Sequence, residues 1–229
     1  MSIASALEEI RSRLRAAALA NARPADSVKL IAVSKLQPAE AIREAYAAGQ
    51  RDFGENYVQE LVQKAEALRD LHDLRWHLIG HLQRNKAKQI VALTSLVHTV
   101  DTVELAQELA KRHAAVSERA LPVLIEVSIA GEAQKHGAEP AAIGELCAAI
   151  DALPALSLRG LMCVPPFTAD PADARPHFDA LARLRELHGG APRLPELSMG
   201  MTSDFEHAVA AGATLVRVGT AIFGARQAP

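Results

Sequence analysis

Two kinds of apolar pattern alternate along the 229 residues of the chain. Short runs rich in valine, isoleucine and leucine are typical of buried strands, whereas the stretches between them space apolar residues three and four positions apart, as amphipathic helices do. The helical spacing is clearest in PAEAIREAYAAG from Pro38 and in DPADARPHFDALARLRELHG from Asp170. The pattern therefore predicts strand and helix in turn along the chain, after a first helix in MSIASALEEIRSRLRAAALA.

Eight segments are strand candidates, and helical segments separate them. They span residues 28–35, 51–56, 75–80, 96–101, 121–128, 156–164, 196–201 and 214–224. Strands that alternate with helices form parallel sheets with crossover helices. Eight such units predict one domain over residues 1–229, a single (β/α)8 TIM barrel with an extra amino-terminal helix. An open, doubly wound sheet is the alternative, and the absence of a G-x-G-x-x-G sequence after the first strand disfavours it.

Composition narrows the classes of function. The formal net charge of −2 provides no general positive field, and we interpret the run Arg84, Lys86, Lys88 as a solvated helix face, so no nucleic acid is expected as a partner. Cys147 and Cys163 are too few for a disulfide framework or a thiolate metal site. Because no long apolar stretch suits a signal peptide or membrane span, we expect a cytoplasmic protein without a membrane partner.

Lys35 closes the apolar run VKLIAVSK, at the predicted end of the first strand. In a barrel the reactive residues cluster where strands end and loops begin. A partly buried amine has a lowered pKa, so more of it is the neutral nucleophile that attacks an aldehyde. Without other evidence such a lysine is more often an end residue that reaches solvent. The reactive interpretation of Lys35 therefore depends on a phosphate site nearby.

The turn after the seventh strand candidate, in SMGMTSDF at 198–205, is the first candidate phosphate site. A helix that begins near Met201 has backbone N–H groups without partners and a dipole that favours an anion, and Thr202 and Ser203 add hydroxyl donors. The alternative is a capping box, because Ser203 and Glu206 have the S-x-x-E spacing that satisfies a helix start without a ligand.

A second turn, in VRVGTAIFG at 216–224, follows the eighth strand candidate. Gly219 and Thr220 offer a backbone N–H where a side chain would crowd a ligand. Phosphate groups in barrels commonly lie beyond the seventh and eighth strands, so the two turns together favour phosphate. The same strand carries Arg217 between two valines, and this buried guanidinium needs an acceptor. Either a carboxylate inside the barrel or the pyridine nitrogen of pyridoxal phosphate would serve, and arginine can only donate to it.

Five motifs in a fixed order cover nearly the whole chain, and with them the sequence resembles the pyridoxal phosphate homeostasis protein family. That family, also called the proline synthetase co-transcribed homologue, is similar to the barrel domain of alanine racemase. The motifs are AVSKLQP around Lys35, FGENYVQE from Phe53, WHLIGHLQRNK from Trp76, GLMCVPP from Gly160, and SMGMTSDFEHAVAAGATLVRVGTAIFGAR from Ser198.

The resemblance implies a fold-type III barrel that lacks the carboxyl-terminal β domain and binds pyridoxal phosphate covalently, as a Schiff base on Lys35. The other implied cofactor-binding residues are Ser198, Thr202, Gly219 and Thr220 around the phosphate, Arg217 at the pyridine nitrogen, and Asn56, His77 and Met199 along the cofactor. Thr202 stands where the family usually has serine, which keeps the hydroxyl. The segment QKHG at 134–137 departs from the usual S-K-S-G, and Ser128 stands where asparagine is common, so the family's role for the loop around Lys135 is less secure here.

No metal site is expected. His77 and His81 are four residues apart, but this spacing crosses a strand and a turn instead of following one helix face, and no carboxylate or cysteine accompanies them. Structural or cofactor-lining roles are favoured for both histidines.

The resemblance also bears on catalysis. Related racemases are similar in carrying a second domain that supplies a tyrosine base, and we expect this chain to lack it, with Tyr46 and Tyr57 on or near helices. An unprotonated ring nitrogen is a weak electron sink, which makes proton removal at Cα slow. We therefore predict a non-catalytic, monomeric protein that binds pyridoxal phosphate and related B6 vitamers, for storage or delivery to apo pyridoxal phosphate enzymes. A racemase-like enzyme on a small amino acid is one alternative, and a Schiff-base aldolase on a phosphorylated sugar is another.

Overall fold

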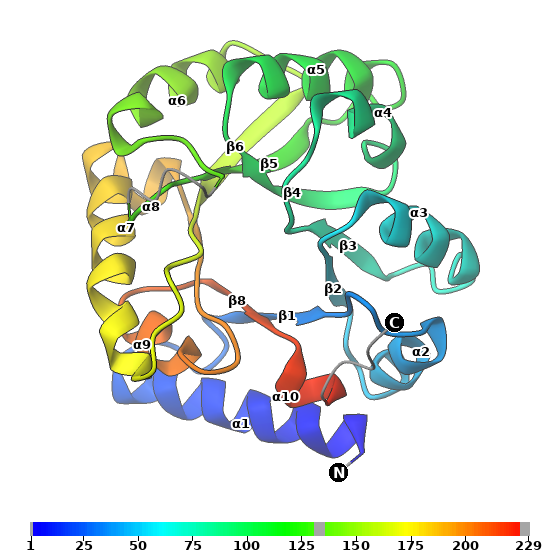
Figure 1. The fold of residues 1–229 in the computed structure, drawn as a ribbon, viewed down its shortest axis with the longest axis vertical. Helices are drawn as coiled ribbons and strands as arrows, with labels where there is room; N and C mark the ends of the chain where they lie inside the picture. The colour runs from blue at the N-terminus through cyan, green and yellow to red at the C-terminus, as the bar shows by residue number, and fades with distance from the viewer. Residues whose placement is uncertain (1, 131–135, 225–229) are drawn as a thin grey trace.

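The computed structural model describes residues 2–130 and 136–224, and these form a closed barrel of eight parallel strands (Figure 1). Each strand pairs with the next in sequence, and β8 closes the barrel against β1. The strands are β1 (Lys29–Val33), β2 (Asp52–Glu55), β3 (Arg75–Leu78), β4 (Thr94–Val100), β5 (Leu121–Glu126), β6 (Leu156–Met162), β7 (Glu196–Ser198) and β8 (Leu215–Val218). The (β/α)8 prediction is confirmed, because an open sheet has two edge strands whereas here β8 pairs with β1 and closes the sheet.

Helices surround the barrel, as Figure 1 shows. They are α1 (Ile3–Ala20), α2 (Ala39–Ala47), α3 (Val58–Ala67), α4 (Ala87–Ile90), α5 (Val103–Ala114), α6 (Ile143–Asp151), α7 (Arg175–Leu187), α8 (Gly190–Arg193), α9 (Phe205–Ala210) and α10 (Thr220–Phe223), with 3-10 turns η1 (Arg84–Lys86), η2 (Pro140–Ala142) and η3 (Pro171–Ala174). No helix in the described part of the chain is long and apolar enough to cross a membrane.

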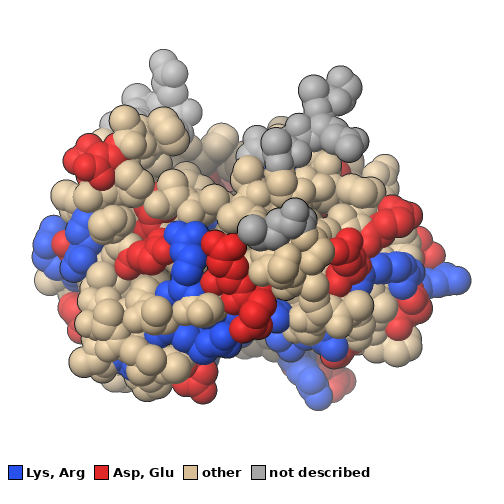
Figure 2. Space-filling model, turned by 90° about the horizontal axis from the view of Figure 1, so that it is seen from below, with Lys and Arg blue, Asp and Glu red and all other residues tan. Residues whose placement is uncertain are grey.

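The amino-terminal helix α1 lies outside the strand order and packs against α2, α9 and α10. Its start is fixed by Ser2, whose hydroxyl accepts a hydrogen bond from the backbone N–H of Ser5 at 3.2 Å. Leu7, Ile10 and Leu14 recur at helical spacing and are buried against the barrel. Figure 2 shows the side of the molecule where α1 lies, on which acidic and basic side chains are interspersed.

Side chains alternate between two layers along each strand, because successive residues of a strand point to opposite faces. Outward side chains join the core between the sheet and the helices, as Phe53 and Trp76 do. Inward ones fill the barrel, where an apolar cluster separate from that core consists of Ile31, Leu96, Leu124, Met162 and Leu215. Arg217 is two residues from Leu215, so its side chain also points into the barrel.

The eighth strand is shorter than the pattern predicts. Residues 214–224 were expected to be extended, but β8 ends at Val218 and α10 begins at Thr220. Gly219 makes this change of direction close to β1, where a Cβ on it would lie 3.1 Å from the Val33 carbonyl oxygen. The apolar run continues through the turn because Ile222 packs into the core, so hydrophobicity alone did not mark the end of the strand.

Candidate functional site

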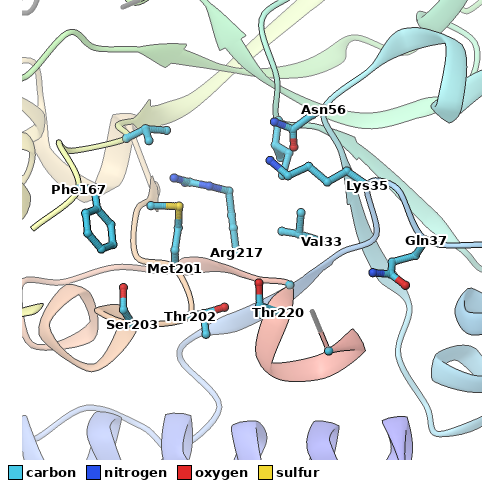
Figure 3. Close-up of a pocket in the computed structure, with 14 residues that line it drawn as sticks. Val33, Lys35, Gln37, Asn56, Phe167, Met201, Thr202, Ser203, Arg217 and Thr220 are labelled. Atoms are coloured by element: carbon cyan, nitrogen blue, oxygen red, sulfur yellow. The ribbon is translucent and has the colours of Figure 1, made fainter. Parts of the chain in front are cut away.

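A cavity of about 410 Å³ opens at the carboxyl ends of the strands, which is the end where barrel proteins place their reactive residues (Figure 3). The segments that follow β1, β2, β7 and β8 supply most of its polar side chains. It is lined by Val33, Lys35, Gln37, Asn56, Ile79, Val164, Phe167, Met201, Thr202, Ser203, Arg217, Gly219, Thr220 and Gly224. The cavity thus combines an amine, a guanidinium, a carboxamide and several hydroxyl groups on mainly apolar walls.

Lys35 lies two residues beyond β1, is half-buried, and extends along the wall near Asn56 in Figure 3. The residue after it, Leu36, has a φ of 60°, a left-handed conformation that non-glycine residues rarely adopt. Its backbone N–H donates to a carboxylate oxygen of Glu60 at 2.7 Å, which holds the turn in place. The backbone on the carboxyl side of the lysine is therefore fixed by the Glu60 side chain on α3.

A buried ion network centred on Lys64 of α3 contacts the residue before Lys35 and so supports the same turn. The Lys64 ammonium donates to the Ser34 carbonyl oxygen at 2.7 Å, and to carboxylate oxygens of Glu55 and Glu60 at 2.8 Å each. The Ser34 hydroxyl donates to Glu55 at 2.7 Å. Burial raises the pKa of Glu55, and the nearby ammonium opposes that shift. These residues immobilise the segment that carries Lys35, and the sequence analysis did not identify them.

The opposite wall is built from the turns after β7 and β8. Thr202 and Ser203 lie in the first turn, and Gly219 and Thr220 lie in the second. Figure 3 shows the hydroxyl groups of both turns on this side of the cavity. The second turn comes close to β1 because a glycine stands at position 219, as described above. The two predicted phosphate turns therefore belong to one cavity.

The capping-box interpretation of the first turn is wrong. α9 begins at Phe205 with Asp204 as its N-cap residue, and the Asp204 carboxylate accepts from the Met201 N–H at 2.6 Å. Glu206 points away and forms an ion pair with Arg13 on α1. The Ser203 hydroxyl is therefore not used in a reciprocal cap with Glu206, although the spacing would allow one.

Arg217 is buried and its guanidinium reaches the cavity. Nη1 donates to the Ser198 hydroxyl oxygen at 2.6 Å, and Nη2 donates to the Cys163 carbonyl oxygen at 2.9 Å. Among the described residues no carboxylate forms an ion pair with it, so the salt-bridge alternative is wrong. Burial lowers the pKa of Arg217, but an arginine stays charged in a protein.

Asn56 supplies an unused acceptor. Its Oδ1 is buried and has no hydrogen-bond partner in the described part of the chain. Its backbone lies against Gly80, where a Cβ would come within 2.2 Å of the Asn56 carbonyl oxygen. A buried polar atom without a partner is costly, so this carboxamide is suited to contact a bound molecule.

Six of the nine predicted cofactor-binding residues line the cavity together, and three do not. The six are Lys35, Asn56, Thr202, Arg217, Gly219 and Thr220. His77 and Ser198 lie deeper inside the barrel, where other side chains occupy their polar atoms. Met199 follows Ser198, so its side chain faces the helices and is fully buried in the outer core. Strand alternation and depth in the barrel thus separate these three residues from the cavity walls.

One cluster near the cavity has side chains of the metal-binding type. His81, Asp101 and His136 place possible ligand atoms within 4.8 Å of one another. The two imidazole rings are stacked, with centroids 3.5 Å apart and planes 9° apart. Nitrogen lone pairs lie in the ring plane, so those of two parallel rings do not converge on one ion in this arrangement. His77 takes no part in this cluster, and Lys135 lies outside the described residues.

The chain matches the family described as alanine racemase, N-terminal domain, over residues 6–227. This match and the closed barrel place it in that class of barrel protein. Within the class the sequence is similar to pyridoxal phosphate homeostasis proteins along nearly its whole length. The protein from Pseudomonas aeruginosa is 46% identical over 226 residues, covering 98% of this chain and 96% of the relative. The one from Aquifex aeolicus is 43% identical over 232 residues, covering 99% and 100%. The chain belongs to the pyridoxal phosphate homeostasis protein family.

Solved structures agree with this placement. PipY of Synechococcus elongatus PCC7942 with PLP bound is 42% identical, with a TM-score of 0.83 and coverage of 97% of this chain and 100% of that chain. Alanine racemase from Corynebacterium glutamicum has a TM-score of 0.70 at 17% identity, and the match covers 96% of this chain but 62% of the racemase. The second likeness shows a shared barrel fold alone.

Proposed function

We propose that this protein binds pyridoxal 5'-phosphate through a Schiff base on Lys35 and holds it for storage or delivery. One observation carries the proposal: Lys35 and the two hydroxyl and glycine turns line opposite walls of a single cavity. The cavity fits the cofactor, because the Asn56 carboxamide oxygen has no partner among the described residues and the Gly219 turn leaves the wall without a side chain. When bound, pyridoxal phosphate would supply an aldehyde that reacts with amines.

Each part of the cavity has a role in this proposal. The Lys35 amine forms the covalent bond, and the ion network behind it fixes the position of the lysine. Thr202, Gly219 and Thr220 hold the phosphate through hydroxyl and backbone N–H donors. Arg217 donates to the pyridine nitrogen, and Asn56 contacts the ring. His77, Ser198 and Met199 do not contact the cofactor in this proposal. The side chains of His77 and Ser198 are hydrogen-bonded inside the barrel, and that of Met199 is buried in the outer core.

We further propose that binding is not followed by efficient catalysis at Cα. An arginine at the ring nitrogen can only donate, which keeps that nitrogen unprotonated. The tyrosines are poorly placed as bases: Tyr46 donates to Asp73 on the outside of the barrel, and Tyr57 is exposed beyond β2 and does not line the cavity. A racemase-like activity on a small amino acid is the second candidate, because Lys35 itself could act as one base.

The wider setting follows from the same proposal. The chain would act as one barrel unit and as a monomer in the cytoplasm, with related B6 vitamers as further ligands. Apo pyridoxal phosphate enzymes would receive the cofactor, because the cavity is open at the end of the barrel. These expectations rest on the relatives' family and on the location of the site.

An absorption spectrum of the protein mixed with pyridoxal phosphate tests the covalent bond. The bound cofactor should absorb near the violet edge, and borohydride reduction followed by peptide mapping should place it on Lys35. An adduct confined to Lys29 or Lys135 would contradict the proposal.

Solvent deuterium exchange then separates storage from catalysis. Enzymes typically turn over at about 1 to 1000 per second, so even a slow racemase at micromolar concentration would label alanine or serine within minutes. We expect no exchange above that of free pyridoxal phosphate. We also expect the loaded protein to restore activity to an apo pyridoxal phosphate enzyme. Stereoselective exchange that is lost in Lys35→Ala would favour the racemase-like alternative.

A further inference from the structure

A continuous chain of hydrogen bonds crosses the inside of the barrel and ends on Arg217. Asp52 Oδ1 lies 3.0 Å from His77 Nε2, and His77 Nδ1 lies 3.0 Å from His98 Nε2. His98 Nδ1 lies 2.9 Å from the Ser198 hydroxyl oxygen, which Arg217 contacts at 2.6 Å. The five side chains come from β2, β3, β4, β7 and β8, and each residue is 5% exposed or less. Only Arg217 of these five reaches the cavity.

An ion pair fixes the Asp52 end of this chain of hydrogen bonds. Arg75 donates to both carboxylate oxygens of Asp52, at 2.9 and 2.7 Å. Burial alone would raise the pKa of Asp52, but hydrogen bonds from Arg75 and His77 outweigh it, so the pKa lies below its ordinary value. Asp52 is therefore an ionised group that can only accept. Asp52 and Arg75 also line a second cavity of about 320 Å³ at the amino-terminal end of the barrel.

An acceptor at one end sets the direction of every bond in the chain. Because Asp52 only accepts, His77 must carry its proton on Nε2. Burial lowers the pKa of His77 and places that of His98 well below its ordinary value, so both rings are neutral. A neutral ring has one donor nitrogen, so His77 Nδ1 accepts from His98 Nε2–H. His98 Nδ1 then accepts from the Ser198 hydroxyl, whose oxygen is left to accept from Arg217.

This direction matters for Arg217. The Ser198 oxygen and the Cys163 carbonyl oxygen hold Nη1 and Nη2, and two fixed contacts define the plane of a guanidinium. Nε–H has no acceptor among the described residues, and the side chain borders the cavity. If Ser198 turned its proton toward Arg217, two donors would face each other at 2.6 Å. The neutral histidines also keep further positive charge away from the same end of the cavity.

We propose that Asp52, His77, His98 and Ser198 are positioning residues that hold Arg217 in one orientation, with an N–H directed at the pyridine nitrogen of the bound cofactor. The proposal rests on the proposed function for the identity of the ligand. A merely structural role would predict that the chain satisfies buried polar groups and stabilises the barrel without affecting how the cavity recognises the ring nitrogen.

Ligand discrimination separates the two roles. We would measure the Kd of pyridoxal phosphate and of its 1-deaza analogue, in which a C–H group replaces the ring nitrogen. The wild type should prefer pyridoxal phosphate by about ten- to a hundredfold, the value of a hydrogen bond to a charged group. Ser198→Ala should lose about tenfold of that preference, with the Kd of the analogue nearly unchanged.

Thr94→Val is the matched control. Thr94 is buried on β4, and its hydroxyl donates to the Ile90 carbonyl oxygen at 3.0 Å, away from the chain and the cavity. It should lower stability and leave the preference intact. If Ser198→Ala raises the Kd of both ligands by the same factor, the hydrogen-bond chain has only a structural role and the proposal is overturned. If the wild type binds both ligands equally, this inference and the role given to Arg217 fail, while the binding of pyridoxal phosphate through Lys35 and the phosphate turns stands. If it binds neither, the proposed function fails as well.

Nitrogen-15 NMR of the histidine side chains tests the direction of the chain without any cofactor. His77 and His98 should both be neutral with the proton on Nε2 at about pH 7 to 8. In Asp52→Ala the acceptor of the His77 Nε2–H is gone, but Arg217 still can only donate to Ser198, so both rings should keep the proton on Nε2 while the His77 proton exchanges faster with solvent. A proton on Nδ1 of either wild-type ring, or a positively charged ring, would overturn the assignment.

Discussion

The two walls of the cavity are made in different ways. The wall that carries Lys35 is held by buried charged groups, with the Lys64 ammonium joined to two carboxylates and to the Ser34 backbone. The wall formed by the turns after β7 and β8 uses glycine, threonine and serine, and its approach to β1 depends on the lack of a side chain at Gly219. One wall fixes a long, flexible amine, and the other leaves backbone and hydroxyl donors open to an anion. The difference follows from what each wall must do.

The largest expected effect removes the amine itself. Lys35→Ala should abolish the covalent chromophore completely and leave the fold intact, since the residue lies at the rim of the barrel beyond the packed layers. Borohydride trapping and circular dichroism measure the two properties. Lys29→Ala, at the other end of β1, is the control and should bind normally. A trapped adduct that persists in Lys35→Ala would show that another lysine is used.

The second prediction concerns the support behind the same wall. Lys64→Met leaves Glu55 and Glu60 without their buried cation, and breaking a buried pair from one side costs about 3 to 5 kcal/mol. The free energy of unfolding, from urea titration, should fall by about that much. Arg69→Met breaks an exposed pair with Glu66 and should cost less than about 1 kcal/mol. Equal effects of the two substitutions would show that the network does not hold this wall.

The third prediction concerns the opposite wall. Thr202→Ala removes one hydroxyl donor to a doubly charged phosphate, and such bonds are worth about 1.5 to 3 kcal/mol. The affinity for pyridoxal phosphate should fall about ten- to a hundredfold, as fluorescence titration would show, with stability nearly unchanged. Pyridoxal, which lacks the phosphate, should bind parent and variant about equally. If the variant still distinguishes the two ligands as the parent does, the phosphate does not contact Thr202.

The smallest expected effect comes from Glu126, a half-buried acid at the end of β5 that lies outside the two walls. Burial, with a smaller contribution from Asp101, raises the pKa of Glu126 from 4.5 to about 7. Above pH 4.5 the unfolded chain releases this proton while the folded protein keeps it, so stability should fall as pH rises from about 4.5 to 7. Partial solvent contact limits the loss to about 1 kcal/mol. Glu126→Gln should remove this part of the pH dependence, and an unchanged slope in thermal unfolding would contradict the assignment.

Much of the fold could be predicted because barrel strands and their helices carry local patterns. Seven of the eight strands were placed within a few residues, and the turns after β7 and β8, predicted from their glycine and hydroxyl residues to bind phosphate, lie at one cavity. The eighth strand was predicted too long, since Ile222 continues the apolar run after the backbone has turned. The capping box failed for a related reason: Glu206 is equally able to pair with Arg13 on a helix about 190 residues away.

The sequence by itself determined the alternation of strands and helices, the lysine at the end of the first strand and the small residues of the two turns, because these depend on neighbours along the chain. Closure of the barrel decided the rest. It brings His98 to Ser198 from 100 residues away and surrounds Arg217 with acceptors that no local pattern reveals. It also places Met199 outside and Ser198 inside, because register and depth in a closed sheet are set by all eight strands together.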